Sequence, residues 1–335
     1  MSDPLLSVRD LRTEFDTDAG VVRAVDGASF DVEAGETVCL VGESGSGKTV
    51  ACESITRLIP TDTGAITGGE VRFDGEDLTD LSASALTEYR GNRIAHVFQN
   101  PQGALDDVYT VGEQVVETVR AHRDLDKAAA REAAIDLLDR VGIPDAADRV
   151  DDYPHSFSGG MKQRVVLAIA LAGDPDLLIA DEPTTALDVT IQAQILRLLG
   201  EIQAERGMGL LFVTHDLGVV AEIADRVVVM YAGKVMETGD VYELFENPAH
   251  PYTRALLDCL PGHGEAFDTI DGLTPDPTDP PDGCRFHPRC DHAVEDCRAG
   301  EQPAFEPVGD DHDAACVLYG DDHQPPLSFP DKHDD

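Results

Sequence analysis

The chain has 335 residues, roughly two domains' worth of sequence, and carries 65 acidic against 25 basic residues, for a formal net charge of −40. A surface this acidic repels phosphate backbones, which excludes broad non-specific binding of nucleic acids. Hydrophobic residues make up 42% of the chain, enough for a sizeable core, so a wholly disordered protein is excluded as well.

The acidic excess has two interpretations. At molar salt the screening length falls to about 3 Å, so like charges repel one another little. A large acidic excess with only 5 Lys therefore favours a protein adapted to a salt-rich cytoplasm, and an ordinary acidic protein is the alternative.

The longest apolar stretch, residues 165–173, is half of the roughly 18 residues that a membrane span needs. Residues 1–15 lack the apolar segment of a secretory leader, so we expect a cytoplasmic location.

Short apolar runs alternate with helical periodicity over residues 1–260. In chain order, the patterns predict a β-hairpin at 5–15 and 21–32, a strand at 37–41, a helix at 48–58 and a strand at 70–73. Beyond these, they predict helices at 127–141, 161–172 and 191–205, strands at 177–180 and 210–213, and a hairpin at 227–238. This alternation predicts an α/β fold whose mostly parallel sheet is covered on both faces, with ligands at the carboxyl ends of its strands.

The composition changes near residue 260. Residues 261–335 contain 11 of the 20 prolines and four of the seven cysteines. We therefore expect two parts, residues 1–260 and a small irregular extension over 261–335, with a disordered end at about 320–335.

The first apolar strand leads into a glycine-rich loop that matches G-x-x-x-x-G-K-[ST] and precedes a helix. Its residues are Gly42, Glu43, Ser44, Gly45, Ser46, Gly47, Lys48 and Thr49. Glycines let backbone N–H groups approach phosphate oxygens, Lys48 would reach the β- and γ-phosphates, and the Thr49 hydroxyl would bind Mg²⁺. The alternative is a glycine-rich turn that carries a surface lysine.

Polar residues follow three other predicted strands. Asp181 stands where a carboxylate can reach a nucleotide-bound Mg²⁺, and Glu182 beside it is the candidate to polarise the attacking water. Gln99 and His215 each follow a further strand. Taken alone, the acidic pair could cap a helix and the histidine could be an ordinary polar residue. Beside a phosphate loop, these residues instead indicate a nucleotide-hydrolysing site.

Small residues also open a second helix, at Ser158, Gly159 and Gly160. One interpretation is ordinary N-capping by the serine. The other is a second phosphate-binding helix N-terminus, directed at a nucleotide bound on another subunit.

Together these motifs resemble the ATP-binding cassette (ABC) ATPases over about residues 5–260. The segments that carry the resemblance are, in order, GESGSGKT, Gln99, FSGGMKQR, LLIADEP, Ala186-Leu187-Asp188 and His215. VYTVGEQ after the glutamine and HPYTRALLDCLPG near residue 255 are similar, more narrowly, to ATPase subunits of oligopeptide/dipeptide importers.

The resemblance implies a P-loop NTPase core with an N-terminal antiparallel β subdomain and an inserted helical subdomain at about 100–172. Two subunits would sandwich two ATP molecules, each held by the phosphate loop of one subunit and by Ser158, Gly159 and Gly160 of the other. The remaining roles that it implies are Glu182 activating water, Gln99 and Asp181 completing the Mg²⁺ site, His215 contacting the γ-phosphate, Asp188 communicating across the dimer and Phe15 stacking on adenine.

The same resemblance implies partners. They are two transmembrane permease subunits, contacted through residues 99–117, a second ATPase subunit that we expect to be a different chain, and indirectly an extracellular solute-binding protein. The subunit itself would lie on the cytoplasmic face of the membrane. The alternatives are an importer of sugars or metals and a soluble ABC ATPase outside transport.

Four cysteines of the extension, Cys284, Cys290, Cys297 and Cys316, are spaced as C-x5-C-x6-C-x18-C. This spacing is unlike the closely paired ligands of zinc sites, whereas four thiolates can hold a [4Fe–4S] cluster. The extension also resembles that of peptide-importer ATPases, some of which carry such a cluster. We therefore expect a [4Fe–4S] cluster that staples a segment too small to bury its own core, with Zn²⁺ or metal-free cysteines as alternatives.

Overall fold

The computed structural model describes residues 3–99, 103–185, 187–260 and 270–320. The expected boundary after residue 260, most of the expected disordered end, and Ala186 lie outside these ranges. Within them, no helix combines the length and the apolar composition that crossing a membrane requires.

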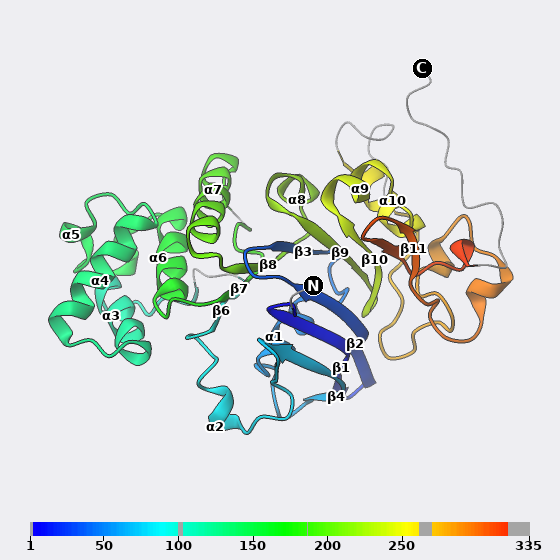
Figure 1. Ribbon diagram of the computed structural model, residues 1–335, viewed down its shortest axis with the longest axis horizontal. Coiled ribbons are helices and arrows are strands. Elements are labelled where there is room, and N and C mark those ends of the chain that lie inside the picture. The colour runs from blue at the N-terminus through cyan, green and yellow to red at the C-terminus, as the bar shows by residue number, and fades with distance from the viewer. Residues whose placement is uncertain (1–2, 100–102, 186, 261–269, 321–335) are drawn as a thin grey trace, which may run out of the picture.

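Two sheets organise the described residues (Figure 1). A four-stranded sheet has the order β2-β1-β4-β5, and an eight-stranded sheet has the order β11-β12-β10-β9-β3-β8-β7-β6. The strands of the first sheet are β1 (Leu6–Thr17), β2 (Gly20–Val32), β4 (Gly64–Phe73) and β5 (Glu76–Asp77). Those of the second are β3 (Thr37–Val41), β6 (Ile94–Val97), β7 (Leu177–Asp181), β8 (Gly209–Thr214), β9 (Arg226–Tyr231), β10 (Lys234–Asp240), β11 (Glu306–Gly309) and β12 (His312–Ala314).

Parallel strands form the centre of the larger sheet. β3 pairs with β8 on one side and β9 on the other, and β8, β7 and β6 continue in parallel. Every residue of β3, β7 and β8 is buried, as continuous apolar runs in a sheet covered on both faces should be. The carboxyl ends of β3, β6, β7 and β8 therefore meet at one edge, and the polar residues singled out above follow these ends.

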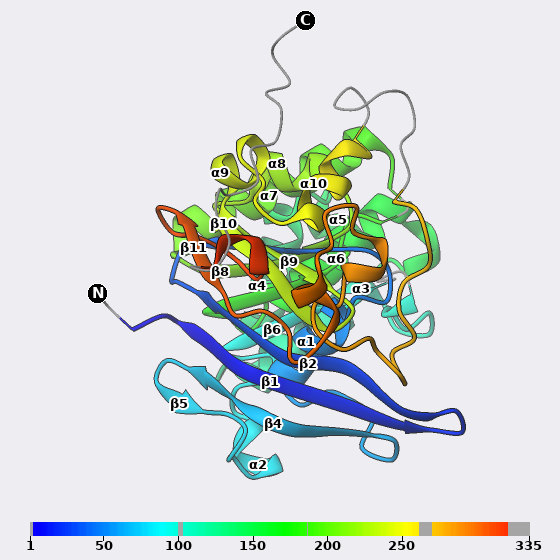
Figure 2. The same cartoon turned by 90° about the vertical axis from the view of Figure 1, so that its right-hand side faces the viewer.

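The smaller sheet is antiparallel, and β1 pairs with β2 and β4. Helix α1 (Lys48–Ile55) packs its apolar side into the core shared by this sheet and the larger one. Figure 2 shows the β1–β4 layer below the larger sheet, with α1 between them. The predicted helix at 48–58 ends early because Arg57 adopts a left-handed φ of 53°, which ends a right-handed helix.

A group of helices lies at one end of the molecule (Figure 1). It consists of α3 (Val111–His122), α4 (Lys127–Arg140), α5 (Ala146–Arg149) and α6 (Gly159–Leu171). Each of the long helices begins at a residue whose side chain accepts a backbone N–H: Thr110, Asp126 and Ser158. The other α-helices of the described residues are α2 (Ala83–Leu86), α7 (Val189–Arg206), α8 (Leu217–Ile223), α9 (Val241–Glu246) and α10 (Pro251–Asp258).

The C-terminal extension is not wholly irregular, and the prediction is wrong on this point. β11 and β12 form an antiparallel pair, and β12 adds to β10 at the edge of the larger sheet. The physical reason is a buried polar group that needs a partner: Glu237 on β10 is fully buried and its Oε1 lies 2.7 Å from Nε2 of His312 on β12. Cys284, Phe286 and Cys297 also join the main hydrophobic core, so the extension packs as part of the body.

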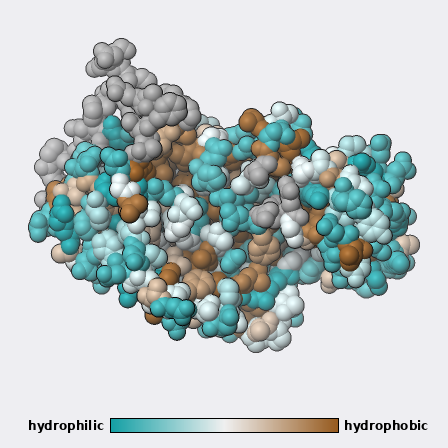
Figure 3. Space-filling model, turned by 180° about the vertical axis from the view of Figure 1, so that it is seen from behind, coloured by the Kyte–Doolittle hydropathy of each residue, from teal (hydrophilic) through white to brown (hydrophobic). Residues whose placement is uncertain are grey.

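The surface reflects the composition. Seen from behind, hydrophilic residues cover most of the two ends of the molecule, and hydrophobic residues gather toward the middle of that face (Figure 3).

Candidate functional site

The phosphate loop connects β3 to α1. Gly42 has a φ of 148°, and a Cβ there would lie 2.1 Å from the carbonyl oxygen of Met230. Gly47 has a φ of 100°, and a Cβ there would lie 2.2 Å from the carbonyl oxygen of Ala24. Only glycine fits these two positions, because any side chain would collide with neighbouring backbone. Ser44 and Gly45 lie exposed at the tip of the loop.

Lys48 is 6% exposed and folds back into this loop. Its Nζ donates to the carbonyl oxygens of Gly42 (2.8 Å) and Glu43 (2.9 Å) and to the hydroxyl of Ser46 (3.1 Å). Burial lowers the pKa of Lys48, and nearby carboxylates offset only part of this effect. An ammonium group held inside a loop of backbone amides fits the binding of phosphate oxygens.

Asp181, at the end of β7, is 6% exposed, and its Oδ1 has no hydrogen-bond partner within the described ranges. Burial raises its pKa, and a hydrogen bond from Thr49 offsets only part of the increase. A buried carboxylate oxygen without a partner is costly, and a cation relieves that cost. Together with the neighbouring Thr49 hydroxyl, Asp181 therefore fits a nucleotide-bound Mg²⁺.

Three strand ends meet at the carboxylate of Glu182. Its Oε1 lies 2.9 Å from Nδ1 of His215, and its Oε2 accepts hydrogen bonds from Nε2 of Gln99 (3.2 Å) and Oγ1 of Thr185 (3.0 Å). Burial raises the pKa of Glu182, but these hydrogen bonds outweigh burial and bring it below its ordinary value. The carboxylate is thus held ionised in a fixed position, which is what a group that polarises water needs.

The second helix N-terminus lies elsewhere in the chain. Ser158 is exposed and caps α6 by accepting a hydrogen bond from the N–H of Met161 (3.3 Å), with Gly159 and Gly160 opening the helix. Figure 1 shows α6 among the helices at the end of the molecule, away from α1. Asp188 caps α7, accepting from the N–H of Ile191 (3.0 Å). The hydrogen bonds described for Ser158 and Asp188 are therefore with their own helices.

Phe15 is half-buried near the end of β1. It lines a shallow pocket together with Asp16, Thr17, Asp18, Val22 and Thr63. None of these residues belongs to the phosphate loop, so the structure places the predicted adenine-stacking ring in a separate pocket.

All four cysteines of the extension line one small pocket, together with His250, His287 and His292. Burial raises the pKa of Cys284 to about 11 and that of Cys316 to about 12. The thiol donors are those that suit an iron–sulfur cluster or zinc. However, no three histidine, cysteine or acidic side chains of the described ranges are positioned to hold a metal ion together.

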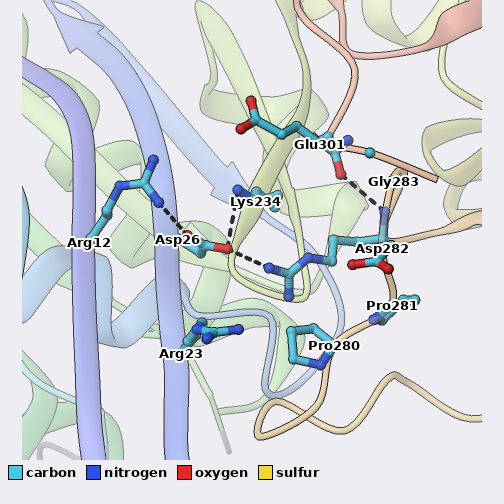
Figure 4. A pocket seen from close by; sticks show the side chains of 12 residues that line it. Arg12, Arg23, Asp26, Lys234, Pro280, Pro281, Asp282, Gly283 and Glu301 are labelled. Atoms are coloured by element: carbon cyan, nitrogen blue, oxygen red, sulfur yellow. Dashed lines mark hydrogen bonds and ion pairs between the residues drawn. The ribbon is translucent and has the colours of Figure 1, made fainter.

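A larger pocket, of about 300 Å³, lies between β2, β10 and the extension (Figure 4). At its centre, Asp26 accepts a hydrogen bond from Arg12 (2.7 Å) and pairs with Lys234 (3.2 Å) and with Arg285. None of these residues is a predicted site residue.

The sequence analysis also missed a contact to the phosphate loop. Arg289 of the extension forms a two-pronged ion pair with Glu43, with Nη1 2.6 Å from Oε2 and Nη2 3.2 Å from Oε1. The signal that could have revealed it is the presence of an acidic residue in a loop meant for phosphate, in a chain with few cations to balance it.

Comparisons with known proteins agree with this geometry. Residues 25–185 match the family model described as ABC transporter, and residues 236–297 match the one described as oligopeptide/dipeptide transporter, C-terminal region. The chain is 50% identical over 330 residues to a protein of Brucella melitensis named as a peptide import ATP-binding protein, covering 94% of this chain and 97% of that protein. A protein of Brucella abortus with the same kind of name is 51% identical over 297 residues, 88% of this chain and 89% of that protein.

Two solved structures have a similar fold. The dimeric ATP-binding cassette MJ0796, in a post-hydrolysis state bound to ADP and Pi, is 28% identical with a TM-score of 0.64, covering 70% of this chain and 98% of that one. The cbiO1 protein of Clostridium perfringens, part of the ABC transporter complex cbiONQ, is 28% identical with a TM-score of 0.62, covering 73% of this chain and 92% of that one.

Proposed function

The chain belongs to the family of ABC transporter ATP-binding proteins, and on that premise we propose that it is the ATP-hydrolysing subunit of an importer for di- or oligopeptides. Hydrolysis of ATP to ADP and phosphate is the activity of this family. The C-terminal region match and the names of the relatives at 50% identity support peptides as the solute.

The observation that carries the proposal is the convergence at Glu182. A carboxylate held by Gln99 and His215 follows Asp181, whose buried Oδ1 has no hydrogen-bond partner among the residues that the structure describes. In the proposed reaction, Glu182 accepts a proton from the water that attacks the γ-phosphate, and His215 orients that carboxylate. Mg²⁺, when bound by Thr49 and Asp181, would neutralise the charge of the phosphates.

The proposed assembly is a dimer of ATPase subunits. Ser158, Gly159 and Gly160 would close over a nucleotide held by the partner's phosphate loop, and Asp188 would face the partner. The exposed N-terminus of α6 and the dimeric state of the similar cassette MJ0796 support this arrangement. We propose that the partner is a second, different ATPase chain.

The proposed membrane contact is the segment 99–117. Within it, Val108 and Tyr109 are 73% and 53% exposed, which is unusual for large apolar side chains and favours a partner surface there. Two permease subunits would dock on it at the cytoplasmic face of the membrane, and an extracellular solute-binding protein would act through them. Adenine would stack on Phe15, which lines a pocket near the end of β1.

The experiment is phosphate release by the subunit, reconstituted in liposomes with its permease subunits and the second ATPase. Stimulation by a peptide-loaded binding protein is the expected result. Stimulation by a sugar- or metal-loaded binding protein instead would overturn peptides as the solute. Hydrolysis that does not respond to the permeases would favour an ABC ATPase outside transport.

We also propose that the four-cysteine pocket holds a [4Fe–4S] cluster, with zinc as the alternative. The support is that Cys284, Cys290, Cys297 and Cys316 line one pocket. Because the described side chains are not arranged to hold a metal ion together as they stand, the cluster would have to draw the thiols together as it binds. Iron and zinc contents of protein purified without oxygen test this. About four irons per chain would support the cluster. One zinc per chain would instead support a zinc site formed by these cysteines, and the absence of both metals would contradict both proposals.

The charge of −40 supports a further proposal, that the protein works in a salt-rich cytoplasm. Refolding and ATP hydrolysis should then require molar KCl, whereas full activity in dilute buffer would contradict the proposal.

A further inference from the structure

A loop of the C-terminal extension reaches the phosphate loop. It runs from Cys284 to Cys290 and carries Arg289, whose side chain is only 4% exposed. The guanidinium group pairs with both carboxylate oxygens of Glu43, at 2.6 and 3.2 Å. Glu43 is the second residue of the phosphate loop, so the extension binds directly to the element proposed to hold ATP.

The guanidinium group of Arg289 has further hydrogen-bond partners besides Glu43. Its Nη1 also donates to the hydroxyl of Tyr231 (3.1 Å), its Nη2 to the carbonyl of Ile270 (2.9 Å) and its Nε to the carbonyl of Asp271 (2.9 Å). A planar guanidinium with this many partners has one orientation, and it presents its charge to Glu43 without rearrangement.

The surrounding aromatic residues hold the loop in place. The rings of Tyr231, Tyr252 and Phe286 pack against one another with centroids 4.6 to 5.3 Å apart. Phe286 belongs to the extension loop, and the hydroxyl of Tyr252 accepts a hydrogen bond from the backbone N–H of Glu43 (2.9 Å). Both the side chain and the backbone of Glu43 are therefore held from outside the phosphate loop.

A second arginine of the extension secures the other side. Arg285 pairs with Asp26 of β2. The backbone N–H of Asp26 donates to the carbonyl of Gly233 (2.9 Å), and the N–H of Gly233 donates to the carbonyl of Ser46 (2.9 Å). The loop 284–290 is thus linked to the phosphate loop twice, directly at Glu43 and, through Asp26 and Gly233, at Ser46.

We propose that Arg289 is a positioning residue of the ATP site, which fixes the phosphate loop and neutralises the carboxylate of Glu43. This inference rests on the proposed function. A glutamate in the phosphate loop places a negative charge where the phosphates of ATP would bind, and like charges repel. With Arg289 in place, the pair is neutral, and the carboxylate of Glu43 no longer repels the phosphates of ATP.

The test compares the dissociation constant of a fluorescent ATP analogue, KM for ATP and kcat in full-length variants. Arg289→Ala should weaken analogue binding and raise KM about tenfold, since a charge-assisted pair is lost, and should leave kcat at saturating ATP within about twofold. Arg289→Lys should recover part of the affinity. Arg298→Ala, an exposed arginine of the same extension, is the matched control and should bind like the wild type.

The decisive variant removes the charge that Arg289 neutralises. In a Glu43→Gln background, Arg289→Ala should weaken binding less than about twofold, because no carboxylate remains to repel the phosphates. A loss of the same size in both backgrounds would mean that Arg289 only supports the fold, and would overturn the proposal. Unchanged affinity in Arg289→Ala alone would overturn it too.

The same series separates this inference from the proposed function. If the wild type fails to bind the analogue, the proposed function fails. If the wild type binds it, Lys48→Ala does not, and Arg289→Ala binds normally, the ATPase assignment stands and only the role of Arg289 is overturned.

Discussion

The imidazole of His215 and the carboxylate of Glu182 lie 2.9 Å apart, Nδ1 to Oε1, although the two residues follow different strands. They meet because β7 and β8 are parallel neighbours whose carboxyl ends lie at the same edge of the sheet. Glu182 adopts a left-handed φ of 45°, a strained backbone conformation for a residue with a side chain. The fold thus holds the backbone of Glu182 in a conformation that residues with a side chain rarely adopt.

Replacement of Glu182 by Gln should stop hydrolysis while ATP still binds. The amide keeps the size of the side chain but cannot accept a proton from water, so kcat should fall by about 10²- to 10⁴-fold. Phosphate release and analogue binding measure the two effects. Glu201→Gln, on the exposed face of α7, is the control. Normal turnover by the Glu182 variant would show that another group activates water.

His215→Ala should shift the pH dependence of hydrolysis. The hydrogen bond from His215 lowers the pKa of Glu182, so its loss raises that pKa. Because Glu182 must be ionised to accept a proton, the acidic limb of the kcat/KM profile should move to higher pH. Profiles of the wild type and the variant measured in the same buffers check this. A lower kcat/KM with an unmoved limb would contradict the proposed coupling.

Lys48→Ala should abolish the stabilisation of the protein by ATP. At a ligand concentration 100 times the dissociation constant, binding stabilises the folded state by about 2.7 kcal/mol. Thermal unfolding with and without MgATP should show this stabilisation in the wild type and in Lys127→Ala, an exposed control on α4, but not in Lys48→Ala. An equal stabilisation of all three would contradict the phosphate-loop assignment.

His96 should make the protein less stable in mild acid. Burial, with a smaller effect of Arg90, lowers the pKa of His96 to about 4, and its Nε2 lies 2.8 Å from Oγ1 of Thr56. In the unfolded chain, the imidazole of His96 takes up a proton near pH 6.5. The stability that the neutral imidazole contributes to the folded protein is therefore complete above that pH and is lost as the pH falls toward 4.

Urea unfolding at pH 7.5 and pH 5.0 measures this effect. His96→Gln keeps a hydrogen-bonding group near Thr56 but does not titrate. The free energy of unfolding of the wild type should fall by about 2 kcal/mol more than that of the variant. Equal losses in the two proteins would show that other groups cause the acid sensitivity.

His312→Ala should destabilise the protein strongly. Oε1 of Glu237 lies 2.7 Å from Nε2 of His312, and both side chains are buried. Breaking a buried pair by removing one partner costs about 3 kcal/mol or more. Urea unfolding at pH 8 checks this, and His312→Gln, which keeps a donor, should lose less. A loss below about 1 kcal/mol would mean that the backbone donors of Ala249 and His250 suffice for Glu237.

Local sequence patterns predicted the elements that hold the candidate site. The apolar runs of β3, β7 and β8 are short, continuous and followed by polar residues, so the strands and their functional ends could be inferred without a structure. Helix α3 was missed, although Thr110 and Glu113 form a capping box that signals its start.

Contacts between distant segments could not be predicted. Arg289 and Glu43 are 246 residues apart, and no periodicity indicates that they meet. The pairing of β12 with β10 likewise depends on the fit of His312 against Glu237, and the three residues of β12 are too few to show a strand pattern. The resemblance to the family implied the proposed roles of Ser158 and Asp188, whose side-chain hydrogen bonds in the described part of the chain are those of helix caps.

The β11–β12 pair of the extension also determines which strand lies at the exposed edge of the larger sheet. β10, with Val235 and Met236 buried, would be its outermost strand without β12, and an uncovered edge invites pairing with another chain and aggregation. In its place the sheet ends at β11, only four residues long, in which Pro307 has no N–H to donate. The extension thereby protects the sheet against growing into a neighbouring molecule.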